Sequence, residues 1–230
     1  MTIWQTISDA AAAAVRSDSI AHLVRALGVG AEPAGKGVAF TIAIVALSAK
    51  MAKSDGLVTS DEVEAFRRVY TFPPSEAENV RYVFDVAKQD VAGYEAYAQR
   101  VGRMLADEPQ LRRDVLEGLF VIAAADGVLH EREDRYLADV ARLMSINESE
   151  LAWVRGLFVR AEANPYATLG LTPTASRDEI KARHRALVLE HHPDKLTGRG
   201  VPREFVAIAE HKLAAINSAF DLLARERGIA

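Results

Sequence analysis

One short polar segment in this 230-residue sequence could carry chemistry: His192-Pro193-Asp194. The proline fixes its own φ and disfavours helical geometry in the residue before it, so the tripeptide ends a helix and presents a carboxylate on a stiff turn. Such a carboxylate can form charge-assisted hydrogen bonds, although the tripeptide taken alone is also typical of a helix stop followed by a turn. Adjacent helical positions point about 100° apart, so His191 and His192 do not make a metal pair. We expect His191 to be a packed, hydrogen-bonded core histidine.

A repeated acidic turn is the second candidate. Residues 51–62 align with residues 122–133, and each copy contains Asp-Gly, two apolar residues and an acidic helix start. The carboxylates that share a seven-residue spacing are Asp55 and Glu62 in the first copy, and Asp126 and Glu133 in the second. Four such groups on facing hairpins offer hard oxygen ligands for a divalent cation. Asp-Gly is also an ordinary turn signal, and Glu62 completes a capping box with Thr59, so a purely structural role stays open.

Helices must position these residues, because aromatic residues are scarce and β-branched stretches are few and short. An apolar helical pattern precedes each acidic turn, at 40–51 and 115–125, and another follows it. Connecting helices within 81–105 and a closing helix at 146–160, capped by Asn147 with Glu150, complete a helical bundle over residues 36–160. Residues 1–35 read as an N-terminal helical segment or arm. A breaker after Arg160 starts a second domain, 161–230, on a short link that leaves it little freedom to swing.

The second domain reads as an antiparallel helical hairpin with the tripeptide at its tip. Ser176 and Glu179 form a capping box for the first long helix. That helix carries an apolar stripe with Ile180, His184, Leu187 and His191, and a basic stripe with Arg177, Lys181 and Arg185. A polar loop is expected at 196–202. The last helix is expected to pack inward through Phe205, Ile208, Ile216, Ala219, Phe220 and Leu223.

Over nearly all of residues 164–225 this pattern resembles a J domain, the module of DnaJ-type co-chaperones. The resemblance rests on Tyr166, Leu169-Gly170, Ile180-Lys181, Arg185-Ala186-Leu187, His192-Pro193-Asp194-Lys195 and Ile216-Asn217-Ser218-Ala219-Phe220. The repeated acidic turns resemble a TerB-like helical domain, and the two in this order resemble the DjlA-like branch. His184 and His191 stand where J domains usually carry tyrosine.

The resemblance implies a function. His192, Pro193 and Asp194 would stimulate ATP hydrolysis by a DnaK-type (heat-shock 70 family) chaperone, with Arg177, Lys181, Arg185 and Lys195 supplying the docking face. Without a zinc-bearing cysteine-rich domain or a Gly/Phe-rich segment, the chain resembles a class C J protein, whose TerB-like domain would bind clients or partners. TerB-like domains are also linked to metal ions, so the alternative is a metal-binding or metal-stress (tellurite-resistance-like) sensor or interaction protein.

Composition narrows the remaining classes. The absence of cysteine excludes disulfides, thiolate catalysis and cysteine-ligated metal sites. The net charge is −6 over residues 1–163 and +2 over residues 164–230, so neither part resembles a nucleic-acid-binding module. The uncharged run of 13 residues between Lys36 and Lys50 is too short for a bilayer, which needs roughly 20 residues, and reads as a buried helix.

No nucleophile motif or phosphate-binding loop indicates an enzyme. We expect no resident cofactor beyond the candidate divalent cation. We also expect a cytoplasmic protein, with attachment to the cytoplasmic face of the inner membrane through residues 1–33 as the alternative, and leave a homodimer open.

Overall fold

The computed structural model describes residues 33–54, 93–125, 128–159 and 164–229, with short pieces between 66 and 84. Every regular element in these ranges is a helix, which confirms the all-α prediction. The N-terminal group comprises α3 (Pro33–Ser54), η2 (Pro74–Glu76), α6 (Tyr94–Met104), α7 (Pro109–Ala123), α8 (Glu131–Leu143) and α9 (Glu148–Phe158). The C-terminal group comprises α10 (Pro165–Thr168), α11 (Arg177–Glu190), α12 (Pro193–Gly198), η4 (Arg203–Phe205) and α13 (Ala207–Arg227). Most of the segment expected at residues 1–35 lies outside the described residues.

Helix α3 is the buried centre of the N-terminal bundle. All its side chains from Phe40 to Lys50 are buried, and it packs on α6, α7 and α8. A helix that is apolar on every side must be covered on every side, so the prediction of a buried helix between Lys36 and Lys50 is confirmed. Among the helices that the structure describes, none has the length and hydropathy needed to cross a bilayer.

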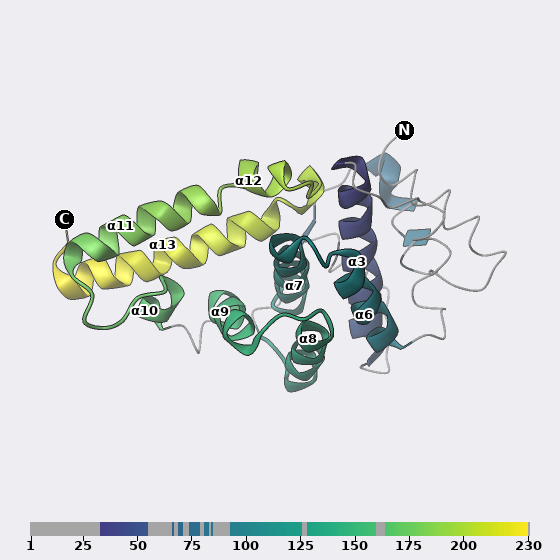
Figure 1. The fold of residues 1–230 in the computed structure, drawn as a ribbon, viewed down its shortest axis with the longest axis horizontal. Coiled ribbons are helices and arrows are strands. Elements are labelled where there is room, and N and C mark those ends of the chain that lie inside the picture. Colours follow the sequence, from purple (N-terminus) through teal and green to yellow (C-terminus); the bar gives the residue numbers. More distant parts are fainter. Residues whose placement is uncertain are drawn as a thin grey trace.

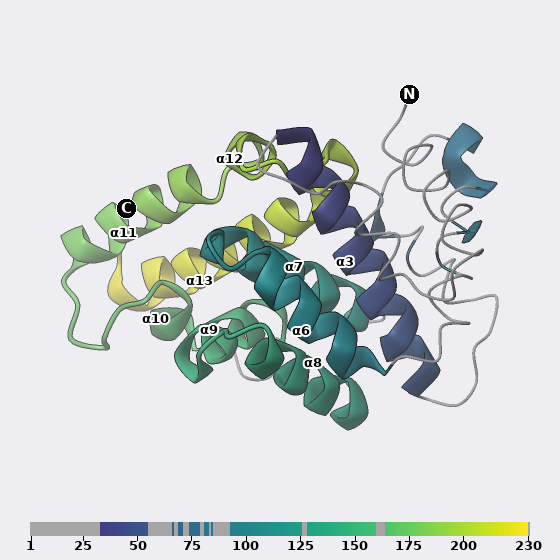
Figure 2. The ribbon, with the colours of Figure 1, turned by 45° about the vertical axis from the view of Figure 1, so that its right-hand side comes forward.

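The two helices that precede the acidic turns, α3 and α7, pack against each other, as the repeat predicts. Helix α6 lies against α3 and α8 (Figure 2). Gly102, which has no side chain, allows α6 to approach α8 closely. A Cβ added to Gly102 would lie 3.0 Å from Cα of Met144. The predicted cap of α9 is confirmed, because the Asn147 side chain accepts a hydrogen bond from the backbone N–H of Glu150 at 2.9 Å.

The C-terminal hairpin forms as its local signals predict. The Ser176 hydroxyl accepts a hydrogen bond from the Glu179 N–H at 3.2 Å, and the Glu179 carboxylate accepts one from the Ser176 N–H at 2.7 Å. These bonds hold the pKa of Glu179 below its usual value. Helices α11 and α13 run side by side (Figure 1), and a small core that includes Ile180, Leu187 and Ile216 joins them.

The segment after the tripeptide differs from the expected polar loop. Residues 193–198 form the short helix α12, and Leu196 and Val201 are buried. Their contacts are with the core of the N-terminal bundle and not with solvent. The prediction of a polar loop is therefore wrong, because Leu196 and Val201 pack into the bundle core although most residues around them are polar.

The beginning of the last helix also departs from expectation. Phe205 and Ile208 contribute to the bundle core, whereas Ile216, Ala219 and Leu223 belong to the hairpin core. The bundle offers Phe205 an aromatic surface, with ring centroids of Phe40 and Tyr70 at 5.2 and 4.7 Å. Edge-on and tilted ring pairs at such separations are favourable beyond the area that they bury. The N-terminal bundle and the C-terminal hairpin, the two modules of the chain, therefore share one core near the start of α13.

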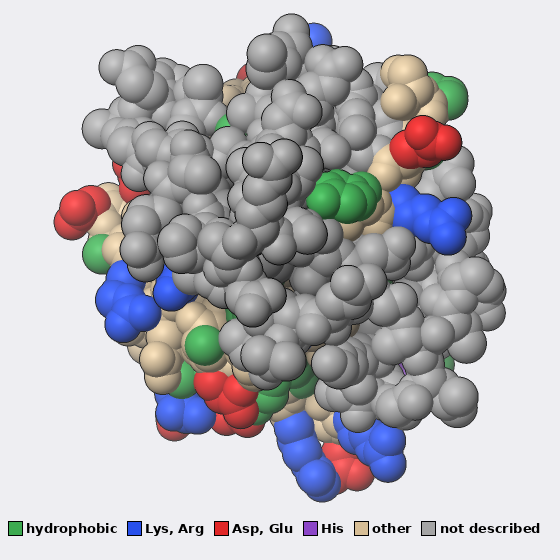
Figure 3. Space-filling model, turned by 90° about the vertical axis from the view of Figure 1, so that its right-hand side faces the viewer, with side chains coloured by type: hydrophobic (Ala, Val, Ile, Leu, Met, Phe, Trp, Pro, Cys, Tyr) green, Lys and Arg blue, Asp and Glu red, His purple; other side chains and the backbone are tan. Residues whose placement is uncertain are grey.

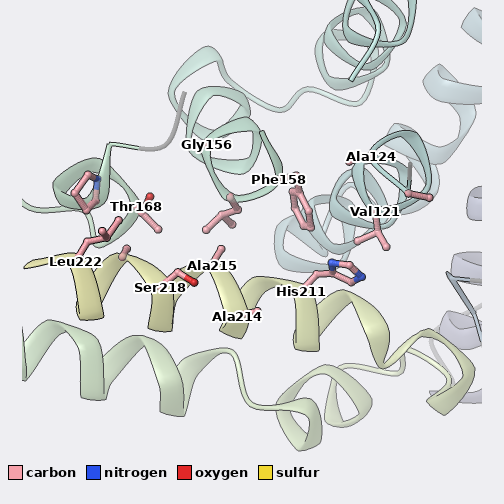
Figure 4. A pocket seen from close by; sticks show the side chains of 14 residues that line it. Val121, Ala124, Gly156, Phe158, Thr168, His211, Ala214, Ala215, Ser218 and Leu222 are labelled. Carbon is pink, nitrogen blue, oxygen red and sulfur yellow. The ribbon is translucent and has the colours of Figure 1, made fainter. Parts of the chain in front are cut away.

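Along the rest of α13 the two modules leave a cavity of about 540 Å³ between them. Side chains of α13, most of them alanine or serine, face α7, α9 and α10 across it (Figure 4). Its labelled lining residues are Val121, Ala124, Gly156, Phe158, Thr168, His211, Ala214, Ala215, Ser218 and Leu222. The contact between the modules is thus close near Phe205 and looser towards the middle of α13.

Candidate functional site

The His192-Pro193-Asp194 tripeptide builds its own turn. His192 is the N-cap of α12 and Pro193 occupies its first position, where a missing N–H costs nothing. The His192 Nδ1 accepts a hydrogen bond from the backbone N–H of Asp194 at 3.3 Å and lies 3.5 Å from the Asp194 Oδ2. The Asp194 side chain is nevertheless 91% exposed and that of His192 52% exposed. The turn therefore fixes the backbone of Asp194 while leaving its carboxylate available to a partner.

The predicted basic residues lie along α11, leading towards the tripeptide. Arg177 and Arg185 are exposed and Lys181 is half-buried. Leu189, four residues after Arg185, is 70% exposed, and Lys195 is exposed on α12. Helix α11 packs on α13, which lies between it and the bundle (Figure 1). This surface can therefore receive a partner without displacing the bundle.

The distribution of charge differs at the other end of the molecule. On the face that Figure 3 shows, the described Lys and Arg side chains stand near Asp and Glu side chains around the edge. Charges of both signs that lie close together cancel at a distance, whereas a stripe of one sign steers an oppositely charged partner. The basic stripe of α11 is therefore a candidate surface for electrostatic docking.

His191, next to the tripeptide, is buried as predicted. Burial, together with nearby cationic side chains led by Lys212, lowers the pKa of its ring to about 3, so the ring is neutral. Its Nδ1 lies 3.4 Å from the Lys212 Nζ. An ammonium group can only donate, so Nδ1 is the acceptor and Nε2 carries the hydrogen. The ring of Trp153, from α9, lies 5.6 Å from that of His191 and 5.8 Å from the Lys212 Nζ.

His184, the second histidine at a position where J domains usually carry tyrosine, packs within the hairpin. Its ring stacks on Phe220 with centroids 4.1 Å apart, and its Nε2 lies 2.9 Å from the Asn217 Oδ1. The imidazole ring of His184 thus joins α11 to α13 through both a stacked ring and a hydrogen bond.

Two ion pairs with buried carboxylates join the modules, and neither was predicted from the sequence. Asp114 of α7 accepts two hydrogen bonds of 2.8 Å from Arg199, which follows α12. Glu117 of α7 pairs with Lys212 at 2.5 Å. A signal existed, because Lys212 lies four residues from both Ile208 and Ile216 in the apolar stripe of α13, and Glu117 interrupts an apolar run in α7. A charge at a core position indicates a buried partner elsewhere in the chain.

Of the four candidate metal ligands, Asp55, Glu62 and Asp126 lie outside the described residues. Glu133 forms a capping box at the start of α8, where its carboxylate accepts a hydrogen bond from the His130 N–H at 3.0 Å. Within the described residues, no three side chains of the types that bind metal come together in one place. Metal binding at the acidic repeat stays a prediction.

Two helices joined by an exposed His-Pro-Asp turn, with a basic face on the first of them, define a J-domain protein. The family model "DnaJ domain" matches residues 164–228, and the model "Tellurite resistance protein TerB" matches residues 41–155. The chain belongs to the TerB family and carries a C-terminal DnaJ domain, in the order found in DjlA-like J-domain co-chaperones.

Curated relatives agree with this assignment. A protein of Photobacterium profundum named "Co-chaperone protein DjlA" is 28% identical over 216 residues, which cover 82% of this chain and 78% of the relative. Proteins of the same name from Vibrio cholerae and Coxiella burnetii are 26% and 27% identical, over 78% of this chain and 75% and 74% of their own lengths. No solved structure matches the chain.

Proposed function

We propose that this chain is a class C co-chaperone that binds a DnaK-type chaperone and stimulates its ATP hydrolysis through His192, Pro193 and Asp194. The observation that supports this most directly is the exposed Asp194 carboxylate on a turn with a fixed backbone. The ATPase chemistry belongs to the partner. The J domain supplies a rigid anion that can pair with a cationic side chain of that partner, and charge-assisted pairs of this kind are worth about 1.5–3 kcal/mol.

The basic face of α11 has a separate role in this proposal. Arg177, Lys181 and Arg185 would attract an acidic surface of the DnaK-type partner over distances comparable to the Debye length, which is about 8 Å at physiological ionic strength. Electrostatic attraction of this kind raises association rates more than it raises affinity. Leu189 adds an apolar contact beside these charges.

Single-turnover ATP hydrolysis by the cognate DnaK tests the proposal. The full chain is expected to accelerate hydrolysis, and His192→Gln and Asp194→Asn are expected to abolish the acceleration. Asp221→Asn, which changes an exposed carboxylate of α13, is the matched control and is expected to behave as wild type. No acceleration by a folded wild-type chain would refute the assignment.

For the TerB domain we propose client or partner binding. We also propose that the chain is cytoplasmic. The metal-stress alternative is less well supported, because the relatives that match across both domains are named as co-chaperones. Crosslinking of unfolded proteins to the full chain, with the crosslinked sites mapped to residues 36–160 or to residues 164–230, would test client binding. Cell fractionation with and without residues 1–33 would test the cytoplasmic location against attachment to the membrane.

A further inference from the structure

Two carboxylates of the TerB domain face the J domain. Asp114 and Glu117 lie three residues apart on α7, so they share one side of the helix, and both are almost completely buried. A buried carboxylate is strongly disfavoured unless a cation and further hydrogen bonds accompany it. Their cations, Arg199 and Lys212, both come from the J domain.

Both cations follow the tripeptide in sequence, one at the end of the segment 191–199 that contains it and the other in contact with the beginning of that segment. Arg199 is the residue at which α12 ends, and its guanidinium holds both oxygens of Asp114. Two parallel bonds of this kind fix orientation as well as distance. Asp114 therefore anchors the end of the segment that begins at His192.

The beginning of the segment is held through His191. This residue is the C-cap of α11, and its ring Nδ1 accepts a hydrogen bond from Lys212, which also pairs with Glu117. The Trp153 ring lies against both His191 and Lys212. The position of the His191 ring, and with it the backbone that leads directly into His192, thus depends on a side chain of α7.

The middle of the segment is anchored by burial. Leu196 is buried in the bundle core, whereas Asp194, two residues earlier, is largely exposed. A segment held on one side and exposed on the other needs little ordering when a partner binds, and such preorganisation favours productive contact.

We propose that Asp114 and Glu117 are positioning residues for the His-Pro-Asp turn, so that the TerB domain forms part of the DnaK-activating site. The inference rests on the function proposed above. Neither carboxylate needs to touch the partner. They act through Arg199, and through Lys212 and His191, on the geometry of His192 and Asp194.

The test uses the full chain and two readouts. In single-turnover ATPase assays with increasing co-chaperone, Glu117→Gln and Asp114→Asn are expected to lower maximal stimulation by about tenfold, because a small misplacement of a group that positions the partner's residues is costly. The half-saturating concentration is expected to stay within about twofold, because the basic face of α11 is unchanged. Amide hydrogen exchange at residues 194–196 is expected to accelerate in both variants.

Matched controls separate positioning from general loss of stability. Asp134→Asn breaks the ion pair of Asp134 with Arg155, which joins α8 to α9 and does not involve the tripeptide. It is expected to leave maximal stimulation and loop exchange unchanged. Arg199→Lys keeps the charge and loses the two-bond geometry, and it serves as the milder variant if Asp114→Asn does not fold.

The outcomes are distinct. Folded Glu117→Gln and Asp114→Asn proteins with wild-type stimulation and wild-type exchange would overturn the inference. Equal effects from Asp134→Asn would overturn it too, since they would show only a loss of stability. If the wild-type chain does not activate DnaK, the proposed function fails, while the exchange readout still decides whether α7 holds the turn.

Discussion

The Nζ of Lys212 lies 2.5 Å from the Oε2 of Glu117, although one residue belongs to the J domain, the other to the TerB domain, and both are buried. Burial raises the pKa of Glu117 to about 7, against the opposing influence of Lys212. The same burial lowers the pKa of the neighbouring His191 to about 3. Two groups in one network thus shift in opposite directions.

These shifts predict opposite pH dependences of stability. Between pH 6.5 and about 3 the unfolded chain binds the proton of His191 more tightly than the folded chain, so His191 costs stability as the pH falls. Between pH 4.5 and about 7 the folded chain holds the proton of Glu117 more tightly, so Glu117 costs stability as the pH rises. Urea unfolding of His191→Gln and Glu117→Gln at about pH 5 and pH 7 measures both effects.

For His191→Gln, the stability lost relative to wild type is expected to be larger at the higher pH. For Glu117→Gln it is expected to be smaller at the higher pH. Glu131→Gln, an exposed change on α8, is the control and is expected to show no such trend, because its side chain is solvated in both states. Parallel behaviour of the two buried variants would contradict the assigned electrostatics.

Two glycines in helices predict opposite results on substitution by alanine. Gly102→Ala is expected to destabilise the chain by about 1–3 kcal/mol, because the new Cβ meets the backbone of α8, which cannot move aside easily. Gly156→Ala, in α9, is expected to stabilise by about 0.5–1 kcal/mol, since nothing lies within 4 Å of its Cβ position and alanine favours helix. Thermal denaturation of both variants decides the matter, and a stabilising Gly102→Ala would show that α6 and α8 are not in close contact.

Phe205 predicts an energetic link between the domains. Phe205→Ala is expected to lower the free energy of unfolding by about 3–5 kcal/mol, a cost usual for a buried aromatic residue. The bundle is expected to share this loss, because the ring packs on Phe40 and Tyr70. Amide hydrogen exchange of α3 and α7 at increasing denaturant concentration reports on the bundle, whereas Trp153 fluorescence would also report on the J domain, because its ring contacts His191 and Lys212. An unchanged bundle transition would mean that the domains fold independently.

The basic face of α11 predicts a salt-dependent contribution to docking. Arg185→Glu is expected to raise the concentration of co-chaperone needed to half-stimulate DnaK by about tenfold at low salt, and by less at high salt. Maximal stimulation is expected to change little. Arg142→Glu, an equally exposed change on α8, is the control. Equal effects of the two variants would place docking elsewhere.

The local structure could be predicted from sequence because its causes are local. The cap at Ser176 needs only Glu179 three residues later, and the turn at His192 needs only the proline after it. The packing of residues 196–205 against the bundle could not be predicted in this way. Leu196, Arg199 and Phe205 take their positions from α3 and α7, which lie more than 70 residues earlier in the chain. The sequence of this segment is compatible with an exposed loop and with a buried one, and the surface that α3 and α7 offer decides between them.

The shared core around Phe205 bears on how such chains can be recombined. A J domain from another protein, joined at residue 164, would have to carry an aromatic ring at the position of Phe205 to fill the space beside Phe40 and Tyr70. It would also leave Asp114 and Glu117 buried without cations unless it supplied their counterparts. The unit that can be exchanged in this chain is therefore larger than the J domain, and a functional chimera would have to carry the facing surface of α7 with it.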